Sequence, residues 1–491
     1  MVTETAAPIH PPGEAPRGVG QSSSPGGSPA RAYPTQEAIE QVQLRKLRAL
    51  LEAILPSNPF YAHKLAAGGP ALRPLTPSLS PFDGERVPFR AGEGKAPGPL
   101  GSHWSGFLTL EEYKRNIPIT TRHDLVRDRL ANPPYGTNLT FPLEAYVRCH
   151  QTSGTTTVPI RWLDTAESWD HIVGNWLQIL DAAGVTRRDR FFFAFSFGPF
   201  LGFWSALDAV QRLGCFCFPG GSMSSMGRLQ AILDNGITAV CCTPTYAQHL
   251  GEVAREKRVD LTCSRLRLLI VAGEGGGSIP ATRARIERLW PGANVFDHHG
   301  MTEVGPVTYQ CPARPGALHV LESAYLPEVI NPESGKPAPA GQTGELVLTT
   351  LDRVGSPLLR YRTGDLVKPR RRSVCVCGRH ELALDGGILG RSDDMVVVRG
   401  VNVYPSLVEE LVRAHPEVAE YRVQLDCRNA MPELSLEVEA AADTPGVATL
   451  PSRLEQSFQT ALNLRVPVVL VPTGSLPRFE MKAQRWVRVT E

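Results

Sequence analysis

The sequence lacks any apolar run close to the roughly 20 residues that a membrane-spanning helix needs. Its N-terminus has no charged segment followed by an apolar core, so no secretory signal is indicated. It also lacks a strong charge of either sign, because 51 basic residues face 49 acidic ones and leave a net charge of +2. A general polyanion binder is therefore disfavoured. We expect a cytoplasmic protein that binds no nucleic acid and no membrane.

Disulfides are a further feature that we do not expect. The chain has ten cysteines, but cytoplasmic thiols stay reduced, so these residues serve as thiols or metal ligands. Cys311, His319, Cys375 and Cys377 have the ligand types of a closed tetrahedral zinc site, and ordinary buried thiols explain them equally well. The other cysteines lie mostly in apolar strands and are expected in the core: Cys149, Cys215, Cys217, Cys241, Cys242, Cys263 and Cys427.

No internal repeat is visible, and 491 residues are too many for one simple core, so we expect two or three domains. Residues 1–32 are rich in Pro, Gly and Ser, which predicts a disordered tail. A second Pro- and Gly-rich stretch, about 68–101, is interpreted as an inserted loop.

The remaining pattern predicts an α/β protein. Apolar residues at three- and four-residue spacing indicate an amphipathic helix over 37–55. Between about 150 and 357, short β-rich runs alternate with helical segments, which favours a largely parallel, layered α/β body. The pattern after Asp394 is α+β. We therefore predict a large N-terminal body over 33–392 and a small C-terminal domain over 393–491.

One absence raises a question about function. The stretch "CHQTSGTTTVPIRW", residues 149–162, has hydroxyls and a glycine that could bind a phosphate chain through side chains and backbone N–H groups. A phosphate loop usually has a lysine, yet Thr157 and Val158 stand where it is expected. The stretch is either a nucleotide site without its cation or a threonine-rich turn. The residues concerned are Thr152, Ser153, Gly154, Thr155 and Thr156.

Other stretches carry groups suited to nucleotides. In "ANVFDHHGMTEVGPV" a strand ends in a glycine turn, after which Glu303 could hold Mg²⁺ and Thr302 a phosphate. Asp365 follows a Thr-Gly turn and could bind a ribose diol, although a hairpin also suits it. Arg391 suggests a phosphate or ribose contact beside the domain boundary. Lys482 follows a Pro-Arg loop, where a lone lysine is usually solvated.

In this order and spacing, the motifs resemble those of the adenylate-forming acyl–coenzyme A ligases, most closely the phenylacetate–coenzyme A ligase branch. The likeness runs from about Gln36, through "NPFYAHKL" and "IPITTRHDLV", to Trp486. It implies two half-reactions. A carboxylate attacks the α-phosphorus of ATP to give an acyl-adenylate and pyrophosphate, and the thiol of coenzyme A then displaces AMP.

The resemblance also implies roles for the nucleotide contacts. The loop of residues 152–156 would wrap the β- and γ-phosphates, and Gly273 and Glu274 in "AGEGGG" would lie against adenine, where glycines permit close approach. Asp365 would bind the ribose hydroxyls and Arg391 the nucleotide.

The same resemblance implies the catalytic groups. Glu303 would bind Mg²⁺, and Thr302 would contact the α-phosphate. Lys482 would neutralise charge that develops during adenylation. Asp393 would be the hinge about which the C-terminal domain then rotates, with Lys482 swung away, before thiol attack. The family's loop continues Gly-Lys-Pro where this chain has Thr157, Val158 and Pro159. We favour a working loop without its lysine over a weakened one, because the other matched groups remain.

An aromatic-rich pocket is expected for the acid, from residues 195–204, 243–248 and 296–300. Its composition favours a flat aryl or arylacetic acid as the substrate. Of the adjacent histidines His298 and His299, at least one is expected to be structural. The predicted lining residues are Phe197, Tyr246, His298, His299 and Gly300. Some members of the branch carry cysteines in the regions named above, which favours zinc. The expected ligands are thus ATP, Mg²⁺, coenzyme A, a small carboxylic acid and structural Zn²⁺, and a homodimer is compatible with them.

Two alternatives stay open. The adenylate could be delivered to an amine or to the thiol of a carrier protein. The missing lysine also allows a catalytically weak nucleotide-binding relative.

Overall fold

The computed structural model of the chain describes residues 33–67, 109–152 and 159–489, apart from positions 393, 395, 400, 429–431, 442–443, 445 and 480–481. The predicted tail over 1–32 and the whole of the predicted insertion over 68–101 belong to the part that is not described. The same holds for several predicted site residues: Ser153, Gly154, Thr155, Thr156 and Asp393.

A five-stranded parallel sheet forms the centre of the body, with the strand order β4-β3-β5-β6-β7. The strands are β3 (Arg190–Phe193), β4 (Phe216–Pro219), β5 (Ala239–Cys242), β6 (Leu268–Val271) and β7 (Asn294–Asp297). The helices around it are α5 (Ala166–Ala182), α6 (Leu201–Leu213), α7 (Ser225–Asp234), α8 (Pro244–Glu256) and α9 (Pro280–Leu289). The predicted alternation of strands and helices is confirmed.

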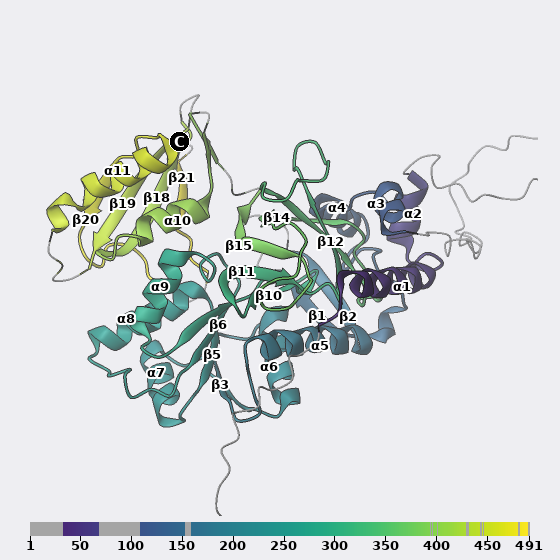
Figure 1. The fold of residues 1–491 in the computed structure, drawn as a ribbon, viewed down its shortest axis with the longest axis horizontal. Helices are drawn as coiled ribbons and strands as arrows, with labels where there is room; N and C mark the ends of the chain where they lie inside the picture. Colours follow the sequence, from purple (N-terminus) through teal and green to yellow (C-terminus); the bar gives the residue numbers. More distant parts are fainter. Residues whose placement is uncertain are drawn as a thin grey trace, which may run out of the picture. The chain divides into compact units, whose positions relative to one another are not determined.

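Helices cover both faces of this sheet, with α6 on one side and α7 and α8 on the other (Figure 1). Successive side chains of a strand point to opposite faces, and strand β3 shows the result. Phe191 and Phe193 join the apolar cluster that contains Trp176 of α5. Phe192 joins a second cluster, with Tyr246 of α8. Continuously apolar strands are expected for a sheet buried on both faces.

Polar side chains mark where these helices begin. Thr165, Ser224 and Thr243 each accept a hydrogen bond from a backbone N–H in the first turn of α5, α7 and α8, which satisfies a donor that the helix itself leaves unpaired. Gly214 ends α6 with a φ of 86°, in the left-handed region that suits glycine. The helix starts therefore follow directly from the sequence.

A six-stranded antiparallel sheet lies beside the parallel one, in the order β10-β11-β15-β14-β13-β12. The prediction of a largely parallel body therefore holds for the first sheet only. The strands are β10 (Thr308–Cys311), β11 (Arg314–Val320), β12 (Tyr325–Ile330), β13 (Gly344–Thr350), β14 (Tyr361–Pro369) and β15 (Ala383–Arg391). Two short antiparallel pairs complete the body: β1 (Tyr146–Gln151) with β2 (Arg161–Thr165), and β8 (Gly300–Met301) with β9 (Gly305–Pro306).

The N-terminal helices pack onto this body. The predicted amphipathic helix is confirmed as α1 (Gln36–Ile54), whose Leu47 and Leu51 are fully buried. The others are α2 (Pro59–Ala67), α3 (Leu110–Asn116), α4 (Arg122–Ala131) and a 3₁₀ turn, η3 (Leu143–Ala145). Among the helices that the structure describes, none is both long enough and apolar enough to cross a bilayer.

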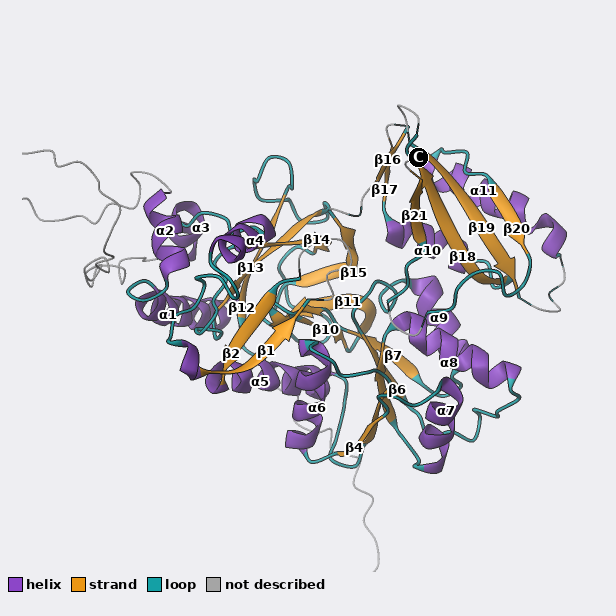
Figure 2. Cartoon of the chain, turned by 180° about the vertical axis from the view of Figure 1, so that it is seen from behind, coloured by secondary structure: helices purple, strands orange, loops and turns teal. Residues whose placement is uncertain are grey.

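The C-terminal domain has its own core, which includes Val408, Tyr421 and Phe458. Its main sheet has the order β20-β19-β18-β21, with β18 and β19 side by side in Figure 2. The predicted α+β character is confirmed. The elements are β16 (Val396–Val398), β17 (Val401–Val403), α10 (Pro405–Arg413), β18 (Val418–Asp426), β19 (Glu433–Ala440), η4 (Val447–Thr449), α11 (Leu450–Leu462), β20 (Val468–Val471) and β21 (Trp486–Val489).

The seven cysteines expected in the core do not all lie there. Cys215, Cys241 and Cys242 are buried, whereas Cys149 and Cys263 are exposed, so the prediction is wrong for those two. Cys149 lies on β1, where burial alternates along the strand and places this side chain outward. Cys263 follows α8 in a loop.

Candidate active site

The carboxyl ends of the parallel strands bring the predicted site segments to one edge of the sheet. Residues 194–200 follow β3, residues 243–248 follow β5, residues 272–278 follow β6, and residues 298–303 follow β7. Because these strands are neighbours in the sheet, the loops after them are neighbours too. The sequence separated these segments by up to a hundred residues.

The glycine-rich loop after β6 packs tightly against the end of β7. Gly273 has a φ of 95°, which disfavours any other residue. A Cβ on Gly277 would lie 2.5 Å from the carboxylate of Asp297, too close for any side chain. Ser278 donates a 2.5 Å hydrogen bond from Oγ to Asp297 Oδ2. The loop can therefore present its backbone closely to a flat ligand.

Asp297 is fully buried, and burial raises its pKa to about 6 despite the hydrogen bond from Ser278 and the nearby charges of Arg283 and His299. A carboxyl whose pKa is higher in the folded than in the unfolded state stabilises the fold below its unfolded pKa. That stabilisation is lost as pH rises through about 6.

We expect the stability of Asp297→Asn relative to wild type to rise between pH 4 and pH 8. The pKa difference of about two units corresponds to about 3 kcal/mol. Thermal unfolding of both proteins across that range measures the difference. A constant difference would contradict a titrating Asp297. Asp260→Asn is the control, because that side chain is exposed and binds only its own loop.

The turn that carries Thr302 and Glu303 joins β8 to β9. Gly300 is needed at its start, since a Cβ there would lie 2.7 Å from the carbonyl oxygen of Gly305. Glu303 is buried, and Tyr361 donates a hydrogen bond to its Oε1 over 2.9 Å. The carbonyl of Thr302 accepts from Arg353 Nη1 at 2.9 Å. The turn is thus fixed from the side of the antiparallel sheet.

Asp365 collects two other predicted site residues. His299 Nε2 lies 3.0 Å from its Oδ2, and Arg391 Nη1 lies 3.4 Å from its Oδ1. Arg391 stands opposite Asp365 in the register of β14 and β15. Burial alone would raise the pKa of Asp365, but His299 and Arg391 hold it below its ordinary value. Asp365 is therefore an ionised, buried acceptor at the site.

The two histidines have different environments. His298 is buried against Trp176, with ring centroids 4.4 Å apart, and burial lowers its pKa to about 3. Its imidazole is therefore neutral at physiological pH. Within the described residues, Nδ1 of His298 has no hydrogen-bond partner. His299 Nε2 instead lies at ion-pair distance from Asp365. The two imidazoles are thus placed by different neighbours, Trp176 and Asp365.

The predicted pocket aromatics divide between two places. Phe197 is half-buried and packs against Phe195 and Trp204 at centroid distances of 5.5 and 4.8 Å. Tyr246 lies in the cluster on the opposite face of the sheet, and its hydroxyl lies 3.1 Å from Ser225 Oγ. The side chain of Tyr246 is therefore not brought together with Phe197.

Lys482 lies next to the glycine-rich loop, because a Cβ on Gly273 would be 3.7 Å from its Cε. The carboxylate of Glu274 accepts from the backbone N–H of Ala483 at 2.8 Å and from that of Thr245 at 2.9 Å. Glu274 thereby connects the first turn of α8 to the segment that carries Lys482.

Thr152 is the described member of the predicted phosphate loop. Its N–H donates to the carbonyl of Ile160, and its Oγ1 accepts from the N–H of Ile160, both over 3.0 Å. These bonds close the base of the loop at the end of β1.

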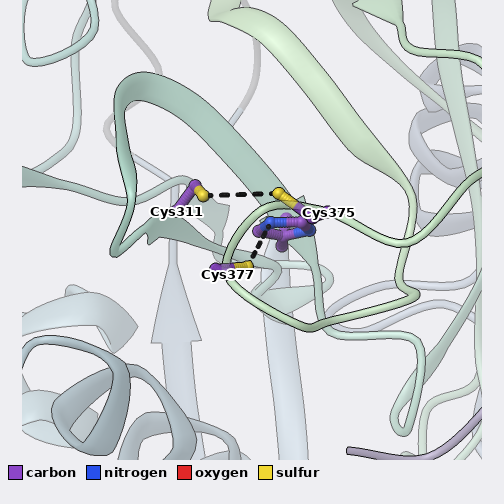
Figure 3. Close-up of side chains that lie close together, drawn as sticks. Cys311, Cys375 and Cys377 are labelled. Carbon is purple, nitrogen blue, oxygen red and sulfur yellow. Dashed lines mark hydrogen bonds between the residues drawn. The ribbon is translucent and has the colours of Figure 1, made fainter.

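The four predicted metal ligands come together. The ligand atoms of Cys311, His319, Cys375 and Cys377 all lie within 4.8 Å of one another. The sulfurs of Cys311 and Cys375 are 3.6 Å apart, and Cys377 Sγ is 3.4 Å from His319 Nε2. Figure 3 shows the three cysteine side chains around one small space, two of them on the loop between β14 and β15.

The chemistry of the cluster suits zinc. Bonds of about 2.3 Å to sulfur and 2.0 Å to nitrogen place tetrahedral ligand atoms roughly 3.5–3.8 Å apart, close to the Cys311–Cys375 and Cys377–His319 separations. His319 Nδ1 lies 3.3 Å from the carbonyl of Glu381, so that Nε2 is left as the ligand atom. Burial lowers the pKa of His319 to about 4, which keeps the imidazole in its neutral, ligating form.

Sequence reasoning missed three residues that orient the site: Tyr361, Arg353 and Asp164. Tyr361 lies shortly before Asp365 in the sequence, but only its hydrogen bond to Glu303 identifies it as a site residue. Asp164 is a carboxylate that follows the buried Trp162 and Leu163 on β2, and a charge in such a place is almost never fully buried unless paired. A carboxylate in a strand that is expected to be buried was therefore the sequence signal that could have pointed to Asp164.

Comparisons with known proteins agree on one family. Residues 151–351 match the AMP-binding enzyme family, and residues 400–488 match the AMP-binding enzyme C-terminal domain. A phenylacetate–coenzyme A ligase of Thermus thermophilus is 32% identical over 418 residues, which cover 81% of this chain and 90% of that protein.

Solved structures of a 2-hydroxyisobutyryl–coenzyme A ligase are also similar. In its postadenylation state, in complex with 2-HIB-AMP, that enzyme matches with a TM-score of 0.82 and 27% identity, over 95% of this chain and 94% of the other. In its thioesterification state, with 2-HIB-AMP and coenzyme A, the TM-score is 0.64 at 28% identity, over 93% and 91% of the two chains.

Proposed function

This chain belongs to the family of AMP-binding enzymes, and from that premise we propose that its substrate is an aryl or arylacetic acid. The enzyme is an AMP-forming acid–coenzyme A ligase. It activates a carboxylic acid with ATP to an acyl-adenylate and then transfers the acyl group to coenzyme A. The observation that supports the proposed substrate is the aromatic wall of Phe195, Phe197 and Trp204 after β3, on a chain similar to phenylacetate–coenzyme A ligases.

The geometry supports a role for each group at the site. The backbone after β6 receives the adenine, the ionised Asp365 accepts the ribose hydroxyls, and Arg391 contacts the nucleotide. Thr302 and the loop that follows Thr152 bind the phosphates. The neutral His298 has an uncommitted nitrogen for the acid, near Gly300.

Lys482 reaches the edge of the glycine-rich loop, where an ammonium can offset negative charge as carboxylate and α-phosphate combine. Adenylation requires no acid–base step from the protein, so positioning and electrostatics carry it. The higher TM-score against the postadenylation state supports assigning this arrangement to the first half-reaction.

Glu303 fits a Mg²⁺ ligand, because it is a buried carboxylate at the phosphate end of the site with one oxygen oriented by Tyr361. The ion, when bound, neutralises charge on the phosphates of ATP. The hydrogen bond from Tyr361 keeps a carboxylate oxygen of Glu303, the ligand type that Mg²⁺ prefers, directed towards the ion.

Tyr361→Phe should raise the Mg²⁺ concentration needed for half-maximal adenylation by about 10- to 100-fold, since residues that orient metal ligands have effects of this size. Mg²⁺ titrations of acid-dependent pyrophosphate exchange measure the shift. Tyr113→Phe is the matched control, because it removes an equally buried hydroxyl that bonds Thr349 instead. Equal titration midpoints for both variants would disprove the role of Tyr361.

We also propose that Cys311, His319, Cys375 and Cys377 hold one structural Zn²⁺ per chain. The site would join β10 and β11 to the loop between β14 and β15, and β14 carries Asp365. Zinc would therefore act on stability rather than on the chemical step. The cytoplasmic location and the homodimer stay predictions from the sequence.

The test of the proposed substrate is acid-dependent exchange of labelled pyrophosphate into ATP with a panel of aryl, arylacetic, short aliphatic and long-chain acids. We expect aryl or arylacetic acids to give the highest exchange, followed by thioester formation with coenzyme A. Exchange with aliphatic acids only would refute the substrate class. Transfer to amines but not to coenzyme A would favour the alternative acceptor.

The missing loop lysine motivates a second candidate, a catalytically weak relative. Val158→Lys distinguishes the two. We expect it to leave exchange intact or to lower the KM for ATP. If only Val158→Lys exchanges pyrophosphate with the panel while wild type does not, the loop is defective and the weak relative is the correct reading.

A further inference from the structure

A buried ion pair lies behind the Thr302–Glu303 turn. Arg353 donates from Nε to Asp164 Oδ1 over 2.6 Å and from Nη2 to Oδ2 over 2.7 Å. The side chain of Arg353 is 3% exposed and that of Asp164 is 0% exposed, so water does not screen the pair. Two parallel hydrogen bonds to a carboxylate fix a planar guanidinium in both position and orientation.

The remaining terminal nitrogen of Arg353 reaches the site. Nη1 donates to the carbonyl oxygen of Thr302 over 2.9 Å. Because a peptide unit is planar, fixing this carbonyl fixes the whole unit between Thr302 and Glu303. The unit contains the Cα atoms of both residues, so its position limits the directions in which the Thr302 hydroxyl and the Glu303 carboxylate leave the backbone.

A contribution to the stability of the fold is a weak explanation for the presence of this buried ion pair. Well-packed apolar residues in place of a buried ion pair are often neutral or stabilising. The loop of Arg353 is also held by neutral hydrogen bonds that do not involve the pair. Ser356 Oγ donates to the carbonyl of Leu163 over 2.8 Å, and Thr140 Oγ1 donates to that of Val354 over 2.7 Å.

The surroundings of the pair connect it to the rest of the nucleotide site. His150 Nδ1 lies 3.7 Å from Asp164 Oδ2, on the strand that leads into Thr152. The segment that begins with Arg353 ends at Tyr361, which bonds Glu303. One stretch of chain thus orients Thr302 at its start and Glu303 at its end.

We propose that Arg353, oriented by Asp164, is a positioning residue for acyl-adenylate formation. It holds the peptide unit of Thr302 so that the hydroxyl and the neighbouring carboxylate meet the phosphates of ATP. The proposal rests on the proposed function, because adenylation is its readout.

The test replaces both charges at once, with Asp164→Leu and Arg353→Met in one protein. This double variant leaves no unpaired buried charge, so we expect it to fold and to melt close to wild type. Pyrophosphate exchange should fall about 10- to 100-fold, since small misplacements of reacting groups have effects of that order. Conversion of a supplied acyl-adenylate to the thioester should stay within about threefold of wild type.

A second ion pair of the same form provides the matched control. Arg267 binds both oxygens of Asp189 over 2.9 and 2.7 Å, and its Nη2 donates to a backbone carbonyl, that of Gly184. Asp189→Leu with Arg267→Met removes the same chemistry at the amino ends of β3 and β6, at the edge of the sheet opposite the site. Its exchange should stay within about threefold of wild type. An equal loss in both double variants would overturn the positioning role.

Arg353→Lys keeps the proposal testable if the double variant fails to fold. Lysine neutralises Asp164 but cannot bind both of its oxygens and Thr302 together, so exchange should fall about tenfold with the melting temperature nearly unchanged. Wild-type exchange in Arg353→Lys, or in the folded double variant, refutes the positioning role alone. No exchange in wild type with any acid refutes the proposed function, and the positioning role with it.

Discussion

Lys482→Ala should lose adenylation by about 10²- to 10³-fold, the effect expected when one group that stabilises transition-state charge is removed. The side chain lies beside Gly273 in this structure, whereas thiol attack is expected after the C-terminal domain has rotated away. The variant should therefore still convert a supplied acyl-adenylate to the thioester. Pyrophosphate exchange and single-turnover thioester formation measure the two half-reactions separately.

Asp393→Pro gives the opposite pattern if the hinge is correctly assigned. Proline fixes φ and restricts rotation, so adenylation should be retained while thioester formation slows. If Lys482→Ala impairs both half-reactions to the same extent, the two-orientation mechanism does not hold for this protein.

Cys375→Ser should destabilise the protein by about 4 kcal/mol or more, because loss of a structural metal is among the most severe effects of a single substitution. Binding of a structural metal contributes directly to the free energy of folding. We expect early melting or aggregation, together with loss of zinc. Metal analysis of protein purified without added zinc should give close to one Zn²⁺ per chain in wild type.

Cys263→Ser is the control for this variant, because Cys263 is an exposed thiol outside the cluster. Its zinc content and melting temperature should equal those of wild type. A zinc content near zero in wild type would rule out the site, and the four residues would then be ordinary thiols and a buried histidine.

Local patterns in the sequence predicted much of the fold. The helix at α1 and the strand–helix alternation from β3 to β7 follow from apolar spacing, which depends only on near neighbours. The antiparallel sheet was not predicted, since its order β10-β11-β15-β14-β13-β12 depends on pairing between strands far apart in the chain. Register of this kind leaves no local signature.

In the candidate site too, the sequence predicted the local motifs but not how strands far apart in the chain bring them together. Motifs predicted Asp365, Arg391 and His299 separately. The three meet around one carboxylate because β14 pairs with β15 and because the residues after β7 contact Asp365. Tyr246 was expected with Phe197, yet the two follow different strands and face opposite sides of the sheet. Side-chain direction depends on where a helix begins, and α8 begins at Pro244.

The position of the Glu274 carboxylate links the binding of nucleotide to the docking of the C-terminal segment that carries Lys482. The carboxylate belongs to the loop proposed to receive adenine and also accepts from Ala483, next to Lys482. If bound nucleotide stabilises the docking of that segment by some free energy, docking must stabilise the binding of nucleotide by the same free energy, because such coupling is reciprocal. Release of AMP therefore favours withdrawal of Lys482 by the same free energy, and a ligand that strengthens the docking of that segment must also strengthen the binding of nucleotide.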